Sequence, residues 1–414
     1  MSAAPLRFYY DVVCPYAYLA SLQIDGFARR FGLEVERRPV LLGGLLRAFG
    51  APDDPNRAMS PARTRHTHAD IRRQGALHGR TLAVPESHPR RTLDAMRLVI
   101  AAPSERRTAV AASLFAAYWE QGRDVAAREV LATIAAAHGL DVAAIDAPEV
   151  KAELRARTDE AAAAGVFGVP TFAHGELRVW GQDRLGILED GLRRGGRIPE
   201  GPPPTPRWIR SDPPPSVRFF HDFASPFSYL ASTQIERVCA AAGAMLEVVP
   251  ILLGALFRSI GTADVPLFTM HPAKQAWVRR DLDDWAAHWG VALAFPSRFP
   301  IRSVLPLRVA LLEPAATAAI YRAAWVDDLP VAEPEVLAGV LDRAGLPAAD
   351  LIAQAEGDAA KAALRRNTED AEAAGICGVP SFVVRRAGRP DAVLWGQDRL
   401  DLLAATLAGF DLPA

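Results

Sequence analysis

Two segments of the chain place a nucleophilic side chain at the same point of the same motif. The first is DVVCPYAYLAS, which carries Cys14, and the second is DFASPFSYLAS, which carries Ser225. Each residue directly precedes a proline, and proline favours the first position of a helix because its missing N–H needs no partner there. The side chain then meets unpaired backbone N–H groups and the positive end of the helix dipole.

This position predicts different chemistry for the two side chains. It lowers the pKa of a cysteine thiol and favours the thiolate. A serine hydroxyl is not ionised there, but it donates a hydrogen bond to an anion bound at the helix N-terminus. Structural explanations stand beside both predictions, because serine is among the best N-cap residues and cysteine is often a small buried residue.

A second repeated motif is GVP, which precedes an expected strand at Pro170 and again at Pro380. A proline in this place suits a cis peptide bond, which is rare enough to be a deliberate feature. The alternative is an ordinary proline at the entry to a strand. A cis bond exposes the backbone of Val169 or Val379 to an extended, peptide-like ligand.

A third repeated motif is WGQDRL, at residues 180–185 and 395–400. It places Asp183 and Asp398 at the start of a helix. Capping of that helix explains an aspartate there without any function. The functional alternative is a carboxylate that, together with the helix N-terminus, holds the charged end of a ligand.

Other reactive residues give weaker signals. His66 and His68 are close enough in sequence to share a metal ion, but no third ligand is indicated, so no metal site is expected. The surrounding arginine-rich stretch is either a solvated basic face or a wall that attracts an anion. Cys239 and Cys377 belong to no CxxC motif and are interpreted as buried residues without a redox role.

The three motifs recur because the chain is a tandem repeat. Their copies are displaced by 211, 210 and 215 residues. We therefore predict one domain at residues 1–195 and a second at 217–414. A proline-rich stretch at 196–216 separates them, and this composition favours an extended, semi-rigid linker.

Each repeat predicts an α/β thioredoxin-like domain interrupted by an all-helical insertion. LRFYYDVV and LEVERRPV are rich in β-branched and aromatic residues and are typical of strands. One helix is expected from Pro15 to the glycine at position 32. VPTFAHGELRVWG predicts a hairpin followed by a helix. The alanine-rich insertions are expected at about 43–154 and 254–364.

The composition excludes several classes of protein. Half of the residues are hydrophobic and 23% are charged, as in globular domains, and the net charge of −1 gives no indication of nucleic-acid binding. No apolar run approaches the ~20 residues that span a bilayer, so no membrane segment is expected. The N-terminus has no pattern of a signal peptide, and three cysteines build no disulfide framework, so a cytoplasmic location is predicted.

Taken together, FASPFSYLAS, GVPSF and WGQDRL resemble the family of 2-hydroxychromene-2-carboxylate isomerases and kappa-class glutathione transferases. These are branches of the DsbA-like thioredoxin-fold superfamily. The resemblance covers nearly all of the second repeat. In the first repeat, DVVCPYAY resembles the DsbA-type turn, with Ala17 in place of the second cysteine.

The resemblance implies glutathione as the cofactor. In the second repeat, Ser225 would hold the glutathione thiolate, and Val379 beside Pro380 would pair with the cysteinyl backbone. Gln397 and Asp398 would meet the γ-glutamyl end. The equivalent residues of the first repeat are Val169, Pro170, Gln182 and Asp183.

Two arginines are the candidates for binding the carboxylate of a substrate. Arg258 falls where the family usually has a lysine near the substrate, and Arg302 replaces the asparagine of the family's FPxNT motif. Thr262 stands where the family usually has another asparagine. These departures from the family pattern leave the identity of the substrate open.

The leading hypothesis is a glutathione-dependent isomerase or transferase that adds a thiolate reversibly to an aromatic-derived unsaturated acid. The alternative is a DsbA-like thiol–disulfide oxidoreductase that uses Cys14 through a mixed disulfide with glutathione. A third interpretation makes the first repeat a supporting domain without activity. A fused tandem is expected to be either a monomeric pseudo-dimer or a homodimer.

Overall fold

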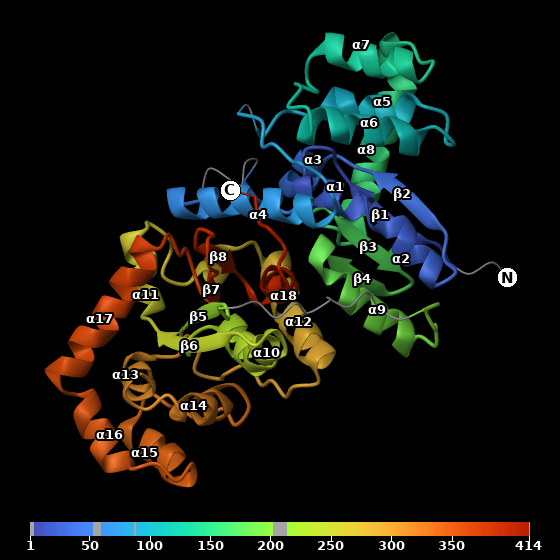
Figure 1. Cartoon of the computed structure of the whole chain (residues 1–414). Coiled ribbons are helices and arrows are strands. Elements are labelled where there is room, and N and C mark those ends of the chain that lie inside the picture. Colours follow the sequence, from blue (N-terminus) through green and yellow to red (C-terminus); the bar gives the residue numbers. More distant parts are fainter. Residues whose placement is uncertain (1–3, 53–58, 87, 202–212, 414) are drawn as a thin grey trace.

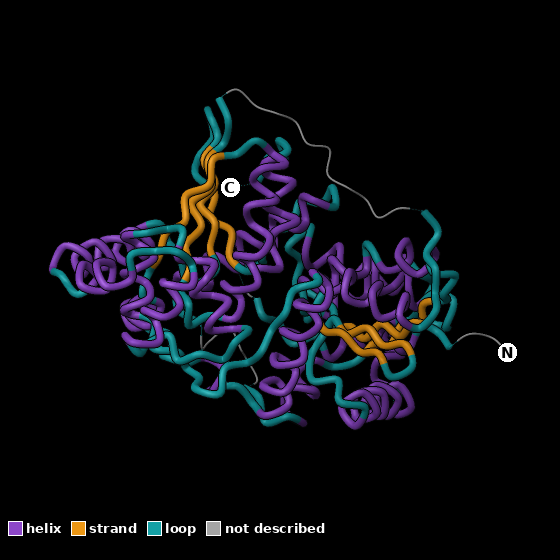
Figure 2. Tube along the Cα trace, turned by 90° about the horizontal axis from the view of Figure 1, so that it is seen from below, coloured by secondary structure: helices purple, strands orange, loops and turns teal. Residues whose placement is uncertain are grey.

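Each repeat folds around its own four-stranded mixed sheet (Figures 1 and 2). The computed structural model describes residues 4–52, 59–86, 88–201 and 213–413. In the first sheet, β1 (Leu6–Tyr10) pairs in parallel with β2 (Val35–Pro39) and antiparallel with β3 (Thr171–His174), which pairs with β4 (Leu177–Trp180). The second sheet has the same order, β6 (Met245–Pro250), β5 (Ser216–His221), β7 (Ser381–Arg385) and β8 (Ala392–Trp395).

The helices of the two domains follow the same order, except that α1 and α2 together take the place of α10 and that a 3-10 helix at Val142–Asp146 takes the place of α16. In the first domain they are α1 (Pro15–Ser21), α2 (Ile24–Arg30), α3 (Leu42–Ala48), α4 (Pro61–Leu77), α5 (Leu93–Ala101), α6 (Arg107–Trp119), α7 (Arg128–Ala137), α8 (Pro148–Ala163) and α9 (Leu185–Arg194). In the second they are α10 (Pro226–Ala242), α11 (Leu253–Ser259), α12 (Pro272–Trp289), α13 (Val304–Leu312), α14 (Ala316–Trp325), α15 (Pro334–Arg343), α16 (Ala348–Ala355), α17 (Asp358–Ala373) and α18 (Leu400–Leu407). This is the predicted thioredoxin fold with a helical insertion in each repeat.

The first domain differs from the prediction in the helix after Cys14. One helix was expected, but the structure has α1 and α2 with a turn between them, whereas α10 of the second domain is continuous. The Gln23 side chain explains the break, because its Nε2 donates to the carbonyl of Leu19 at 3.1 Å and to Gln182 Oε1 at 3.1 Å. A side chain that bonds to the helix backbone in this way interrupts the regular ladder.

The cores fix the turns that carry Cys14 and Ser225. Phe8 stacks on Phe172 across β1 and β3 with ring centroids 5.5 Å apart, and Phe219 stacks on Phe382 in the second sheet at 5.6 Å. Two tryptophans from the insertions are fully buried beneath the turns. Trp119 Nε1 donates to the carbonyl of Val12, and Trp325 Nε1 donates to the carbonyl of Phe223, both at 2.8 Å. Each insertion is thereby tied to the backbone two residues before the N-cap residue of the turn.

The two domains pack against each other through equivalent helices. Figure 1 shows α4 alongside β8 of the second domain and α12 beside α9 of the first, with the outer helices of the two insertions at opposite ends of the molecule. Arg73 Nη1 donates to the carbonyl of Val393 at 2.6 Å, and His288 Nδ1 lies 2.6 Å from Asp190 Oδ2.

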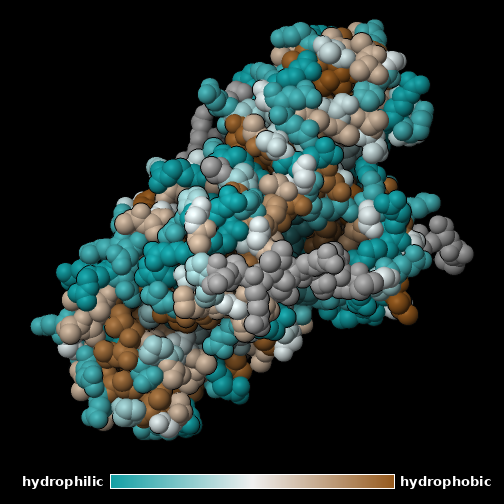
Figure 3. All heavy atoms as spheres, in the orientation of Figure 1, coloured by the Kyte–Doolittle hydropathy of each residue, from teal (hydrophilic) through white to brown (hydrophobic). Residues whose placement is uncertain are grey.

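Most of the predicted linker, residues 202–212, lies outside the described residues, and β5 begins at Ser216, one residue before the predicted domain limit. On the face drawn in Figure 3, hydrophilic residues are interspersed with smaller hydrophobic patches. Within the described ranges, no helix has the length and apolar character needed to cross a membrane.

Candidate functional site

Cys14 and Ser225 occupy the predicted positions at helix N-termini. Each is the N-cap residue of its helix, with extended backbone angles of φ −92° and ψ 116° at Cys14 and φ −101° and ψ 117° at Ser225. A buried aspartate builds each turn. Asp11 Oδ2 accepts a hydrogen bond from the backbone N–H of Leu42, and Asp222 Oδ2 accepts one from that of Leu253, both at 2.8 Å.

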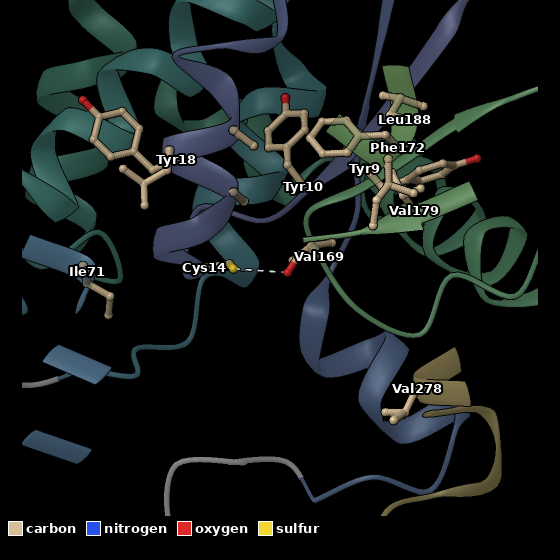
Figure 4. Close-up of a cluster of buried hydrophobic side chains, with 14 of the residues drawn as sticks. Tyr9, Tyr10, Cys14, Tyr18, Ile71, Val169, Phe172, Val179, Leu188 and Val278 are labelled. Atoms are coloured by element: carbon tan, nitrogen blue, oxygen red, sulfur yellow. Dashed lines mark hydrogen bonds between the residues drawn. The ribbon is translucent and has the colours of Figure 1, made fainter. Parts of the chain in front are cut away.

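The Cys14 thiol is not the thiolate that the sequence suggested. Its Sγ lies 3.2 Å from the carbonyl oxygen of Val169, to which the thiol donates (Figure 4), and the residue is only 8% exposed. Burial raises the pKa of the thiol to about 12, although the N–H groups of Tyr16 and Ala17 act in the opposite direction. The cost of burying a charge therefore exceeds the stabilisation by the helix N-terminus.

The Ser225 hydroxyl makes two hydrogen bonds in the equivalent place. It accepts from the backbone N–H of Ser228 at 3.2 Å, which is the N-cap interaction, and donates to the carbonyl of Val379 at 3.3 Å. The residue is 4% exposed. Its structural role as an N-cap is therefore confirmed, and its hydroxyl hydrogen points toward the strand that begins after Pro380.

The two proline motifs have cis peptide bonds, as their sequence suggested. They are Val169–Pro170 and Val379–Pro380. The carbonyl of Pro170 accepts from the N–H of Gly181, and the carbonyl of Pro380 accepts from the N–H of Gly396, both at 2.9 Å. The GVP and WGQDRL motifs, which are separate in sequence, therefore meet beside the turns that carry Cys14 and Ser225.

Glycine is required where these motifs meet. Gly181 has φ 109° and Gly396 has φ 111°, a region that side-chain-bearing residues rarely adopt. A Cβ atom at Gly181 would lie 2.6 Å from Asp183 Oδ1, and one at Gly396 would collide with Asp398 Oδ1. The glycines thus allow the following glutamine and aspartate to turn back toward the cis-proline strand.

A cavity of about 220 Å³ lies beside the Ser225 turn. The second domain lines it with four of the predicted cofactor-binding residues, Val379, Pro380, Gln397 and Asp398. Phe227, Trp395, Gly396 and Arg399 complete that side. The first domain contributes Tyr16, His66, Thr67, Asp70 and Arg184. Ser225 is not in direct contact with the cavity but bonds to Val379, which lines it.

Two buried nitrogen atoms in the cavity wall have no hydrogen-bond partner in the described part of the chain. They are Gln397 Nε2 and His66 Nε2, and the residues are 3% and 8% exposed. Buried polar groups are nearly always hydrogen-bonded in folded proteins. A ligand with hydrogen-bond acceptors in this cavity would satisfy the Gln397 amide, so the residues fit a peptide-like cofactor such as glutathione.

The sequence matches the DSBA-like thioredoxin domain over residues 5–193 and again over residues 216–408. The chain belongs to the DSBA-like thioredoxin family. It carries two copies of the domain, and members of the wider family include 2-hydroxychromene-2-carboxylate isomerases and kappa-class glutathione transferases.

Each individual relative matches a part of the chain as long as one DSBA-like domain. The chain is 29% identical over 202 residues to 2-hydroxychromene-2-carboxylate isomerase of Sphingobium xenophagum, covering 46% of this chain and 97% of that protein. It is 28% identical over 215 residues to glutathione S-transferase kappa 1 of Rattus norvegicus, covering 45% and 91%. A solved 2-hydroxychromene-2-carboxylate isomerase has a TM-score of 0.42 at 23% identity, covering 46% of this chain and 95% of that chain.

The aspartates of both DSBA-like domains take part in an ion-pair network between the domains. Arg184 bonds to Asp281 through two nitrogens, at 3.1 and 2.9 Å, and to Asp398 at 2.7 Å. Arg399 bonds to Asp70 through two nitrogens, at 2.8 and 2.9 Å, and to Asp183 at 2.7 Å. Each arginine thus joins the equivalent partners of the other domain.

The network explains the ionisation of the Asp183 carboxyl. Burial acts to raise its pKa, but Arg184 and Arg399 act more strongly, and the pKa falls to about 2. Asp183 is therefore a charged and only slightly exposed partner of two arginines. The predicted ligand role of Asp183 and Asp398 stays a prediction, and only Asp398 lines the cavity.

The structure separates the two predicted substrate arginines from this cavity. Arg258, at the end of α11, and Arg302, just before α13, are exposed, and neither lines it. In the first domain, Gln182 is held by Gln23. Among the described residues, no group of three or more histidine, cysteine, aspartate or glutamate side chains is arranged to hold a metal ion.

Several residues of the site were not singled out from the sequence. Arg184 and Arg399 are the central ones, and the repeated QDR triplet was the available signal, since the arginine recurs with the aspartate. Trp395 opens the same repeated WGQDRL motif, whereas Tyr16 and Phe227 line the cavity without such a signal, because their neighbours come from distant parts of the chain.

Proposed function

We propose that the second DSBA-like domain binds glutathione and uses it in an isomerase or transferase reaction similar to that of 2-hydroxychromene-2-carboxylate isomerase. The observation that carries the proposal is the buried, unpartnered Gln397 amide, in a cavity that Val379, Pro380 and Asp398 also line beside Ser225. The names of the relatives, an isomerase and glutathione transferases, support the same chemistry.

The residues of the second domain would hold different parts of the cofactor. The backbone of Val379 would pair with its peptide backbone, and the Gln397 amide would donate to a carboxylate or carbonyl oxygen. Ser225 would turn its hydroxyl hydrogen from the Val379 carbonyl toward the sulfur at the N-terminus of α10. Bound glutathione would supply the thiolate that adds reversibly to an unsaturated carbon.

A donor hydrogen bond and the helix N-terminus both favour the anionic form of the sulfur. The substrate would be an aromatic or otherwise unsaturated carboxylate, for which Arg258 and Arg302 remain the predicted partners. Both are exposed and therefore accessible to such an anion.

The alternative of thiol–disulfide exchange at Cys14 receives less support from the geometry. The attacking species in that reaction is a thiolate, and a pKa of about 12 leaves very little thiolate at neutral pH. Ala17 occupies the place of a resolving cysteine and is fully buried. All three cysteines are unpaired and buried, as expected of a protein in a reducing cytoplasm, which is the location we propose.

Matched variants of the two N-cap residues test the proposal. Ser225→Ala and Cys14→Ser are each assayed for glutathione binding by calorimetry, for glutathione conjugation, for isomerisation of 2-hydroxychromene-2-carboxylate and for disulfide reduction. Ser225→Ala is expected to lower conjugation or isomerisation at least tenfold, and Cys14→Ser to leave both within twofold. Loss of all activity in Cys14→Ser, with an unaffected Ser225→Ala, contradicts the proposal.

A further inference from the structure

In each domain, one helix covers the WGQDRL turn of the other domain, and the two helices do so with different side chains. Helices α4 and α12 both begin at a proline, Pro61 and Pro272, which are 211 positions apart. The same displacement relates His66 of α4 to Trp277 of α12. Figure 1 shows each helix lying against the other domain.

The WGQDRL turn of the second domain is covered by His66, which is smaller than its counterpart Trp277. The His66 ring meets the Trp395 ring edge-on, with centroids 5.6 Å apart, and Arg63 lies over the same tryptophan. The position before the GVP motif is Cys377. These side chains leave the cavity of about 220 Å³, which His66 and Trp395 both line.

At the first domain the same place is filled with aromatic rings. Trp277 meets the Trp180 ring edge-on, with centroids 4.8 Å apart, and Lys274 lies over Trp180 as Arg63 lies over Trp395. Phe167 stands where the second domain has Cys377, and its ring is 5.0 Å from Trp180 and 6.0 Å from Trp277. Trp180 Nε1 is buried without a hydrogen-bond partner among the described residues, and the rings of Trp277 and Phe167 pack beside its indole.

Gln182 and Gln397, the glutamines of the two WGQDRL turns, also differ in their hydrogen bonds. Gln182 Oε1 accepts a hydrogen bond from Gln23, so the first domain uses this side chain internally. Gln234, the counterpart of Gln23, bonds instead to Thr233 and Arg237 on its own helix. Gln397 lines the cavity, and its Nε2 has no hydrogen-bond partner among the residues that the structure describes.

We infer that the chain holds one ligand per molecule, in a site that both domains build. His66 of the first domain is a binding residue of the second domain's cavity, and Trp277 with Phe167 closes the equivalent place in the first domain. Gln397 and His66 both line this cavity, and each has a buried side-chain nitrogen without a partner among the described residues. The Gln397 amide is a donor. Burial lowers the pKa of His66 to about 4, so its neutral ring donates from Nε2 when the proton is on that nitrogen, and the two groups then fit a carboxylate or carbonyl group of the ligand. The identity of that ligand as glutathione rests on the proposed function.

Calorimetric titration of the full chain with reduced glutathione tests the inference. The wild-type chain is expected to bind one glutathione, and a stoichiometry of two overturns the inference. His66→Ala removes the nitrogen without filling the cavity and is expected to raise the dissociation constant at least tenfold. An unchanged dissociation constant in this variant excludes His66 as a binding residue.

Two reciprocal double variants test whether aromatic side chains close the binding place in the first domain. His66→Trp with Cys377→Phe gives the second domain the aromatic pair of the first, and binding is expected to disappear while circular dichroism shows an intact fold. Trp277→His with Phe167→Cys is the control and is expected to leave the affinity of the second domain within twofold. Wild-type affinity in the first of these variants overturns the inference.

A wild-type chain that binds no glutathione refutes the proposed function rather than the closure. Crystal structures of the two double variants, without any ligand, then show whether these side chains fill or open the binding place. The inference predicts a filled space beside Trp395 in the first variant and a new cavity beside Trp180 in the second. Unchanged cavities in both structures overturn it.

Discussion

Cys14 and Ser225 occupy equivalent helix N-termini, yet tertiary contacts give them different properties. Both side chains donate to the carbonyl that precedes the cis-proline, at Val169 and Val379. Ser225 also caps its helix, whereas Cys14 makes no capping hydrogen bond. For the thiol, burial outweighs the electrostatic effect of the helix, and the pKa rises to about 12.

The protonation of Cys14 predicts slow alkylation. At pH 8, a thiol with a pKa of about 12 holds roughly a thousandfold less thiolate than an ordinary cysteine, whose pKa is about 8.5. Iodoacetamide is therefore expected to label the native chain at Cys14 roughly a thousandfold more slowly than the chain in guanidinium, as measured by peptide mass spectrometry. Rapid labelling of native Cys14 would show that the thiolate is accessible and would revive the oxidoreductase alternative.

The sequence predicted the positions of Cys14 and Ser225 because the proline signal is local. It did not predict the pKa of Cys14, since the desolvation comes from segments that are distant in sequence. The hydrogen-bond partner Val169, for instance, is 155 positions away. Only the packing of strand, helix and insertion reveals that the thiol is enclosed.

The elements that position the site are the cis-proline strand and the turn before the last helix. The hydrogen bonds from Gly181 to Pro170 and from Gly396 to Pro380 join them in both domains. The positive φ angles of these glycines direct the following glutamine and aspartate. The geometry of the turn, rather than any single side chain, therefore places Gln397 in the cavity wall.

Alanine at these two glycines separates stability from binding. Gly396→Ala and Gly181→Ala each force a rarely populated backbone angle and a contact with the following aspartate, at an expected cost on the order of 1–3 kcal/mol in unfolding free energy. Urea denaturation measures this cost. Only Gly396→Ala is expected to weaken glutathione binding, by at least tenfold in calorimetry. Equal losses of affinity in both variants would contradict the assignment of the site to the second domain.

The strands, hairpins and helical insertions were predictable from local periodicity and turn residues. The break between α1 and α2 was not, because it depends on the contact of Gln23 with Gln182. Gln234, the counterpart of Gln23 in the second domain, is also a glutamine, and the helix α10 that contains it is not broken. The difference lies in tertiary partners that no local pattern records.

The whole molecule is organised around a pseudo-symmetric interface. Arg184 and Arg399 each join two aspartates of the opposite domain, one of them on the helix that covers the arginine's own WGQDRL turn. This arrangement is what an isologous dimer interface becomes when two subunits are fused. We propose that the chain is a monomer, for which light scattering should give the mass of one chain.

Loss of one interface arginine is expected to destabilise the molecule strongly. Arg399→Met leaves the buried Asp70 carboxylate without its arginine, while Asp183 keeps Arg184, and breaking such a buried pair costs about 3–5 kcal/mol. The matched control is Arg155→Met, whose exposed pair with Asp159 is worth no more than about 0.5 kcal/mol. Urea denaturation compares the two variants. Similar stabilities would contradict a structural role for the network.

The repeated QDR triplet indicated that the aspartate and arginine matter in both domains. It did not indicate that their partners are Asp70 and Asp281, because those residues belong to the insertion of the other domain. Contacts between domains depend on how two surfaces meet, and internal periodicity carries no information about that. The composite character of the cavity was therefore beyond prediction from the sequence.

A crystal structure of the wild-type chain with bound glutathione tests the central claim most directly. We expect one glutathione per chain, with its sulfur within hydrogen-bond distance of Ser225 Oγ, its backbone paired with Val379, and a carboxylate or carbonyl oxygen that accepts hydrogen bonds from Gln397 Nε2 and His66 Nε2. Electron density for glutathione at Cys14, or its absence beside Ser225 at saturating concentration, would contradict a single site in the second domain.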